Sequence, residues 1–192
     1  MVRHLSTQSL LQLRIELKYT DPPIWRLITV PDAITLVQLH QVIQVTMGWC
    51  DCHLHEYRIG GLRYGVPDPH WGGDPNLINE RRKRLTSVLK DERQFSYLYD
   101  FGDDWEHRVT LEDRTTPDKP QRFAVCLAGE NACPPEDIGG VPGFEYFKVV
   151  MADPSHQEHD QMREWYSLDF DPQHFDIDEI NTELKRIKLM TA

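Results

Sequence analysis

The sequence predicts an α+β fold in which a mostly antiparallel sheet precedes a helical C-terminal region. Apolar and polar residues alternate over 11–18, which predicts a strand with one solvent-exposed face. Apolar residues recur at helical spacing over 35–47, between segments that read as strands. From Gly143 onward the pattern is mostly helical. Strands grouped ahead of helices are typical of α+β proteins.

The elements that follow the first strand are bounded by turn and cap residues. Asp21-Pro22-Pro23 ends the first strand, and a second strand is expected over 24–30. Thr35 and Gln38 form a capping box that begins the helix. Gly48 is expected to end it. The chain therefore begins with two neighbouring strands and a helix.

A hairpin is expected next. Strands over 54–59 and 62–66 flank Gly60-Gly61, a pair typical of a tight turn. The resulting order of strand, strand, helix, strand, strand is similar to a β-grasp, by analogy of element order alone. Residues 67–80 are rich in Pro, Gly, Asp and Asn, so we expect a mobile loop there.

The rest of the chain predicts three more strands and then helices. The strands are expected over 95–101, 105–112 and 123–127. Asp176 and Glu179 resemble a second capping box ahead of an apolar helical stripe. No repeat or linker indicates a second domain. We therefore expect one domain over 1–192, with a sheet-rich core over 11–128 and a helical part over 143–190.

Composition excludes several classes of protein. Hydrophobic residues make up 40% and aromatic residues 10% of the 192 residues, enough for a packed core. The longest apolar run, 123–128, is too short to span a bilayer. The N-terminal residues contain no signal-peptide core. Four cysteines make no disulfide scaffold. A cytoplasmic location without membrane association is expected.

The negative charge is concentrated in the last third of the chain. The net charge is −10; residues 1–129 carry 16 basic and 17 acidic side chains, and residues 130–192 carry 5 and 14. Such an acidic segment repels a phosphate backbone. The basic run over 81–84 could contact phosphate, but a solvated loop is the simpler interpretation. The identity of any partner is open, with a protein favoured over nucleic acid.

Two polar segments are candidates for a functional cleft. The first, over 99–107, holds three aspartates and a histidine, which could chelate a divalent cation or support acid–base chemistry. In the second, over 134–140, two carboxylates lie between Pro-Pro and Gly-Gly. If the segments meet, the candidate residues are Asp100, Asp103, Asp104, His107, Glu136 and Asp137.

Each candidate also has a structural interpretation. In the expected strand, His107 shares a face with the apolar residues Trp105, Val109 and Leu111, so it could be a hydrogen-bonded core residue. Asp103 and Asp104 beside glycine suit a turn. Glu136 or Asp137 could cap backbone amides or pair with a buried arginine such as Arg26.

A second, weaker candidate is a metal site around residues 50–55. Cys50 and Cys52 precede His53 and His55, which would share one face if both lay on a strand. No second ligand pair at a zinc-finger spacing supports this site.

Five motifs make the chain similar to a known family. They are PIWR over 23–26, LHQVIQVTMGW over 39–49, HLHEY over 53–57, YDFGDDWEH over 99–107 and PPEDIGGVPGFEYF over 134–147. In this order they resemble the Ri-plasmid Orf-three-like family, whose members are often labelled TnpR or transposon passenger proteins. The resemblance covers about residues 11–184 and implies an association with plasmids and other mobile elements. It also implies a cysteine where this chain has Ile138, so a metal site shared with Cys126 and Cys133 would be incomplete.

The residues do not support a resolvase mechanism. The early serines, Ser6 and Ser9, precede the first strand, and the C-terminal third is acidic where DNA would dock. P-loop, dinucleotide-binding, hydrolase-elbow and zincin motifs are also absent from the sequence. We therefore expect a binding or adaptor domain. The alternative is a metal-dependent hydrolase or nuclease that uses the Asp/Glu/His cleft, so whether the protein is an enzyme, and whether it holds a divalent metal, stays open.

Overall fold

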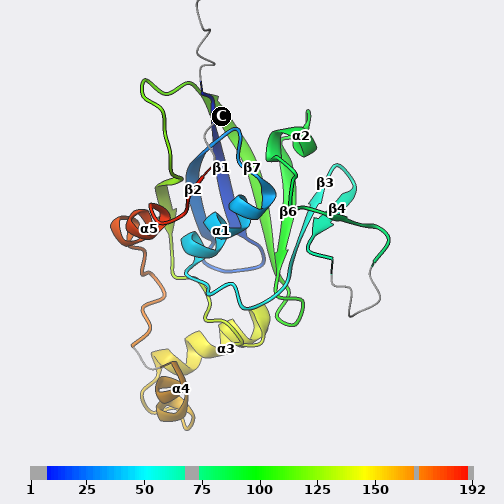
Figure 1. Cartoon of the computed structure of the whole chain (residues 1–192). Coiled ribbons are helices and arrows are strands. Elements are labelled where there is room, and N and C mark those ends of the chain that lie inside the picture. The colour runs from blue at the N-terminus through cyan, green and yellow to red at the C-terminus, as the bar shows by residue number, and fades with distance from the viewer. Residues whose placement is uncertain (1–7, 68–73, 167–168, 190–192) are drawn as a thin grey trace, which may run out of the picture.

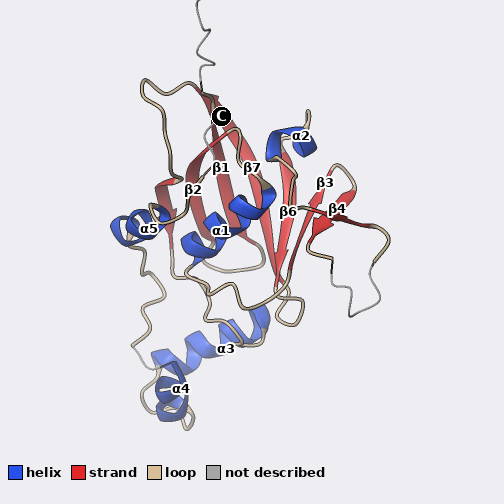
Figure 2. Cartoon of the chain, in the orientation of Figure 1, coloured by secondary structure: helices blue, strands red, loops and turns tan. Residues whose placement is uncertain are grey.

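The protein is built on one long sheet, seen in a computed structural model that describes residues 8–67, 74–166 and 169–189. The strand order is β5-β4-β3-β6-β7-β1-β2-β8, and all neighbours are antiparallel except the parallel pair β4 and β5 (Figures 1 and 2). This confirms a mixed α+β protein with a mostly antiparallel sheet. The strands are β1 Leu10–Leu17, β2 Ile24–Pro31, β3 His55–Ile59, β4 Leu62–Gly65, β5 Leu77–Asn79, β6 Gln94–Tyr99, β7 Trp105–Thr115 and β8 Val125–Glu130.

The N-terminal strand pairs do not form a contiguous β-grasp sheet. Strands β1 and β2 pair, as do β3 and β4, but β7 and β6 lie between the two pairs. The expected order of elements along the chain is present, but the order of strands in the sheet differs from that of a β-grasp, because β6 and β7, which come later in the sequence, lie between the two pairs.

Helix α1, Leu36–Met47, covers one face of the sheet (Figure 1). The Thr35 hydroxyl accepts a hydrogen bond from the Gln38 backbone, and the Gln38 side chain accepts one from the Thr35 backbone. Gly48 ends the helix with a left-handed φ of 78°. The alternating apolar residues of β1 are buried against this helix, as period-two patterning requires. One continuous apolar cluster results.

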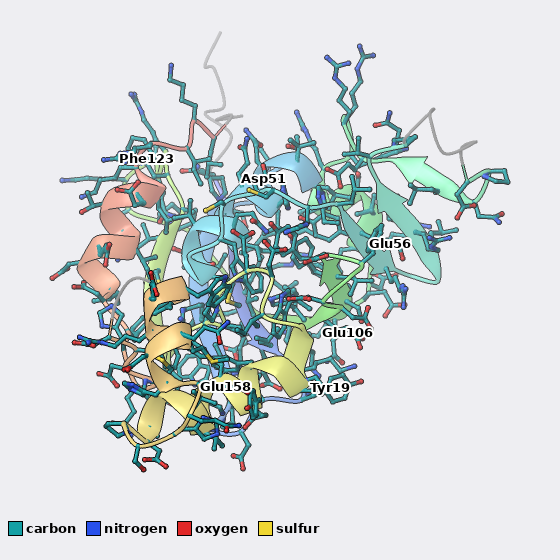
Figure 3. All side chains as sticks on the ribbon, turned by 90° about the horizontal axis from the view of Figure 1, so that it is seen from below. Tyr19, Asp51, Glu56, Glu106, Phe123 and Glu158 are labelled. Atoms are coloured by element: carbon teal, nitrogen blue, oxygen red, sulfur yellow. The ribbon has the colours of Figure 1, made fainter. Side chains whose placement is uncertain are left out.

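The opposite face of the sheet carries ion pairs. Lys18 pairs with Glu106 at 2.9 Å, and the Tyr19 hydroxyl donates to the same carboxylate at 3.4 Å. Glu56 on β3 accepts from Arg58 at 2.8 Å. Figure 3 labels Tyr19, Glu56 and Glu106 among the side chains of the molecule. Antiparallel sheets commonly leave one face to solvent in this way.

Several boundaries differ from those expected. Strand β6 ends at Tyr99 rather than residue 101, because Asp100 adopts a positive φ of 56°. Strand β8 begins two residues later than expected. The expected mobile loop over 67–80 contains β5, while its residues 68–73 lie outside the described part of the chain.

The basic run lies in the turn before a short helix that the sequence did not reveal, α2, Leu85–Leu89. The Lys83 carbonyl accepts a hydrogen bond from Leu36, and Leu85 donates to Ile34. The backbone of this turn therefore ties α2 to the start of α1.

Three helices follow the sheet: α3 Gly140–Ala152, α4 His159–Tyr166 and α5 Ile177–Leu184. In Figure 1, α3 and α4 lie beyond one end of the sheet and α5 lies beside α1. The Asn181 amide on α5 accepts from the Cys126 N–H at 2.8 Å and donates to the Cys126 carbonyl at 2.9 Å. Among the described residues, none of the helices has the length and apolar character needed to cross a membrane.

Candidate functional site

Asp100 lies at the end of β6, where the chain turns toward β7. Its φ of 56° is left-handed, a conformation that aspartate tolerates better than most residues. Its N–H donates to the Leu54 carbonyl at 2.9 Å, and its Oδ1 accepts from the Gly102 N–H at 2.9 Å. The side chain is only 10% exposed. These bonds fix the carboxylate and leave Oδ2 for another partner.

His53 lies in the irregular segment that enters β3. Strands β3 and β6 pair with His55 opposite Tyr99, and this register brings His53 to the Asp100 turn. The His53 Nε2 lies 3.6 Å from Asp100 Oδ2 and 3.2 Å from Asp137 Oδ1. That nitrogen is buried and makes no hydrogen bond. Buried polar atoms are usually paired, so this nitrogen is the most unusual atom of the cluster.

Glu136 holds the 134–139 loop against the sheet. Its Oε2 accepts from the Cys50 N–H at 2.9 Å, and its Oε1 accepts from the Tyr99 hydroxyl at 2.5 Å. Burial, together with the adjacent Glu136 carboxylate, raises the pKa of Tyr99 above its ordinary range, so the phenol stays a donor. Glu136 therefore serves as a structural anchor, with both oxygens engaged.

Asp103 anchors the other end of the same loop. Its Oδ2 accepts from the Gly139 N–H at 3.1 Å. A Cβ at Gly140 would lie 2.5 Å from the Asp103 carbonyl oxygen, so only glycine permits this close approach of the start of α3 to the β6–β7 turn. Between these anchors, Asp137 has a φ of 59° and a side chain that is 73% exposed.

The cluster of His53, Asp100 and Asp137 has the dimensions of a metal site. Each offers one ligand atom, and the three atoms lie within 4.8 Å of one another. Ligands at about 2.1 Å from one ion and at octahedral or tetrahedral angles are roughly 3.0–3.4 Å apart. The two distances from His53, 3.2 and 3.6 Å, are close to that range. The arrangement could hold a divalent cation, with the Asp137 side open to solvent.

Two residues of the predicted cleft lie apart from this cluster. His107 is fully buried, with its Nδ1 3.3 Å from the Tyr97 carbonyl oxygen and its ring edge against Trp49. Burial lowers its pKa to about 4, so it is neutral at physiological pH. Asp104 is exposed, and its N–H donates to the Asp100 carbonyl at 2.7 Å. The two polar segments do meet, but only Asp100 and Asp137 of the six predicted residues join the cluster.

The second predicted set is divided as well. His53 precedes β3 and His55 begins it. The two histidines therefore do not share a strand face, contrary to the expectation. His55 faces Glu80 instead, with its Nε2 3.0 Å from Oε1. Cys50 and Cys52 are exposed free thiols. Hydrogen bonding to Glu136 raises the pKa of Cys50, which disfavours the thiolate that a metal would need.

A buried histidine pair escaped the sequence analysis. The rings of His40 and His55 stack with centroids 3.6 Å apart. His40 Nε2 lies 2.6 Å from Asp51 Oδ1, and its Nδ1 lies 2.7 Å from the Tyr97 hydroxyl. Burial lowers the pKa of His40, and the charge of His55 adds to this effect. His40 lies on the apolar stripe of α1, the only sequence feature that could have indicated its burial.

Comparisons with known proteins extend the structural result. The chain is 39% identical over 176 residues to "Uncharacterized protein y4hQ" of Sinorhizobium fredii, covering 90% of this chain and 89% of that protein. Its fold is similar to the crystal structure of "Protein of Unknown Function MM3350" from Methanosarcina mazei Go1. The TM-score is 0.81 and the identity 33%, over 91% of this chain and 98% of the other. The family profile of plasmid pRiA4b ORF-3-like proteins matches residues 9–179. The resemblance drawn from the five motifs is thus confirmed, and the chain belongs to the plasmid pRiA4b ORF-3-like family.

Proposed function

We propose that this protein binds a divalent metal ion between His53, Asp100 and Asp137. We further propose that it acts as a metal-dependent hydrolase. One observation carries the proposal: a buried imidazole nitrogen without a hydrogen bond faces two carboxylate oxygens from two other segments. A divalent cation would pair with that nitrogen and neutralise both carboxylates.

The ligand set supports a reactive rather than a closed structural site. Three protein ligands leave coordination positions for water or substrate, as catalytic metal sites require. Asp137 is 73% exposed, so solvent reaches that side. One imidazole and two carboxylates suit zinc, manganese or iron better than calcium, which takes six to eight oxygen ligands.

The first test is elemental analysis of untagged protein purified without chelator, followed by calorimetric titration of the metal-free protein with Zn²⁺ and Mn²⁺. We expect near-stoichiometric binding of the metal. Asp137→Asn and His53→Gln should each weaken the affinity at least about tenfold, because loss of a residue that merely orients a metal ligand already costs about that much, and loss of the ligand itself should cost no less. Asp91→Asn, an exposed carboxylate before the other end of β6, is the matched control and should bind as the wild type does. No binding, or equal binding by all four proteins, would contradict the metal site.

Proton competition gives a second measurement. A metal binds only the deprotonated imidazole, so affinity should fall as the pH is lowered from about 8 to about 5. A pH-independent affinity would exclude His53 as a ligand. If metal binds, phosphomonoester and phosphodiester probes test the hydrolase step. If the metal-bound protein hydrolyses neither probe, the hydrolase proposal is contradicted while the proposal of metal binding stands.

A binding or adaptor domain is the second candidate function. Glu136 and Asp103 hold a loop, and His107 lies in the core, so these three polar residues have structural roles. In this alternative a protein partner is favoured over nucleic acid. The four free cysteines agree with the cytoplasmic location proposed from the sequence.

A further inference from the structure

A cavity of about 460 Å³ lies between the end of α1, the 132–136 segment, the 174–176 segment and α5. Apolar side chains line much of it, among them Met47, Trp49, Phe175 and Ile180. This volume is within the range of sites that accept a ligand or a side chain of a partner.

The α5 wall of the cavity is acidic. Glu179, Ile180 and Glu183 face it, at the spacing that places residues on one face of a helix. The exposed Glu179 carboxylate and the half-buried Glu183 carboxylate therefore lie one turn apart at the rim. Glu183 also pairs with Arg186, an exposed cation that a ligand could displace.

The one arginine in the cavity wall has no donor left for an anion. Arg26 is only 3% exposed, and its guanidinium donates to the Thr46, Trp25, Glu130 and Asn131 carbonyls and to Cys133 Sγ. These bonds use all five guanidinium N–H groups. The cavity is thus complementary to a cation rather than to an anion.

The cavity continues into a second hollow of about 570 Å³. The two hollows share Val45, Trp49, Cys50 and Glu183. The second hollow is also lined by Asp51, Arg186 and Lys188, so the complementarity to a cation belongs to the first cavity, at Glu179 and Glu183. Together they form a groove along α1 and α5, which we call the α5 groove. Two adjoining hollows of this size offer more room than a small amine fills, and they suit an extended segment.

We propose that the α5 groove binds an extended peptide segment of a partner protein and places a lysine or arginine side chain between Glu179 and Glu183. The aliphatic part of that side chain would lie on Trp49 and Ile180, while its charged end would meet the two carboxylates. This proposal does not depend on a metal at His53, and it gives the binding or adaptor function a defined surface.

The test uses NMR titration of the ¹⁵N-labelled full chain with three blocked pentapeptides, Ac-Gly-Ala-X-Ala-Gly-NH₂, where X is arginine, norleucine or glutamate. The indole N–H of Trp49, which donates to the Pro134 carbonyl at 2.9 Å, reports directly on the groove. We expect the arginine peptide to shift this resonance and to bind at least about fivefold more tightly than the norleucine peptide, with binding weaker at high salt.

Matched variants locate the binding. Glu179→Gln combined with Glu183→Gln should lower the affinity for the arginine peptide about fivefold or more. Asp178→Asn, on α5 but outside the cavity lining, should leave it unchanged, as should Asp137→Asn. Equal binding of the arginine and norleucine peptides would overturn the proposal. So would an unaffected double variant, absence of binding at millimolar peptide, or binding of free arginine as tight as that of the peptide.

Discussion

His107 shows how burial decides the role of a single residue. It has the side chain of a general base and lies in the densest polar motif, yet the β7 alternation directs it into the core beside Tyr97 and Trp49. Its Nε2 is buried without a hydrogen bond. Desolvation penalises the imidazolium, and this lowers the pKa of His107 to about 4.

This lowered pKa makes stability sensitive to acid. The unfolded chain binds a proton on His107 at about pH 6.5 and the folded protein only at about 4, so stability is lost as the pH falls through that window. Between pH 7 and pH 5 the free energy of unfolding should drop by about 2 kcal/mol from this residue. Urea unfolding followed by fluorescence at both pH values, for the wild type and His107→Leu, measures the difference.

In His107→Leu this part of the pH dependence should disappear, while the part contributed by His40, whose pKa is also lowered by burial, should remain. An unchanged pH dependence in the variant would refute the assignment. If the variant does not fold, NMR titration of the His107 ring in the wild type gives the same answer, because a midpoint near 6.5 would show that burial does not depress the pKa.

At the scale of elements, α5 closes an open edge of the sheet. Strand β8 is the last strand beside β2, and an unpaired edge is a site for unwanted pairing with other chains. The Asn181 amide satisfies both backbone groups of Cys126 on that edge. The Asp176 side chain caps the same helix by accepting from Asp178 and Glu179, which fits the expected start of α5.

Removing the Asn181 amide should loosen this edge. Asn181→Ala leaves the Cys126 N–H and carbonyl without their partner, so we expect the free energy of unfolding to fall by about 1–2 kcal/mol. Thr182→Ala, whose hydroxyl bonds only within α5, is the control and should change stability by less than about 0.5 kcal/mol. Urea denaturation compares the three proteins. Equal stability of Asn181→Ala and the wild type would mean that water replaces the amide at no cost.

At the scale of the whole molecule, the net negative charge opposes binding to the phosphate backbone of DNA. The net charge is −10, and the basic run over 81–84 lies in a turn that joins α1 and α2. A resolvase function, which the TnpR label of similar proteins suggested, gains no support from this net charge.

The protein should therefore not be retained on double-stranded DNA even at about 50 mM salt, where electrostatic attraction is strongest. A gel-shift series over about 50–200 mM salt measures this. Binding that weakens steeply with salt would instead indicate several phosphate contacts. Arg81→Gln with Arg82→Gln would then locate them.

Local chemistry determined much of this protein from its sequence. The alternation over 11–18 predicted β1, and five motifs indicated the family. The capping box at Thr35 and the stop at Gly48 predicted α1. The short β5 and α2 were missed, because elements of three and five residues carry too few periodic positions. The β-grasp analogy failed at the level of sheet order for a related reason, since strand insertion is a non-local event.

The tertiary structure alone decided which polar residues meet. Pairing of β3 with β6 brings His53 to Asp100, and the close approach at Gly140 brings Asp137 to both. The same packing sends His107 into the core and stacks His55 on His40. A sequence specifies which side chains are available, but contacts between distant segments depend on which strands pair and where their backbones approach, and such pairings are non-local.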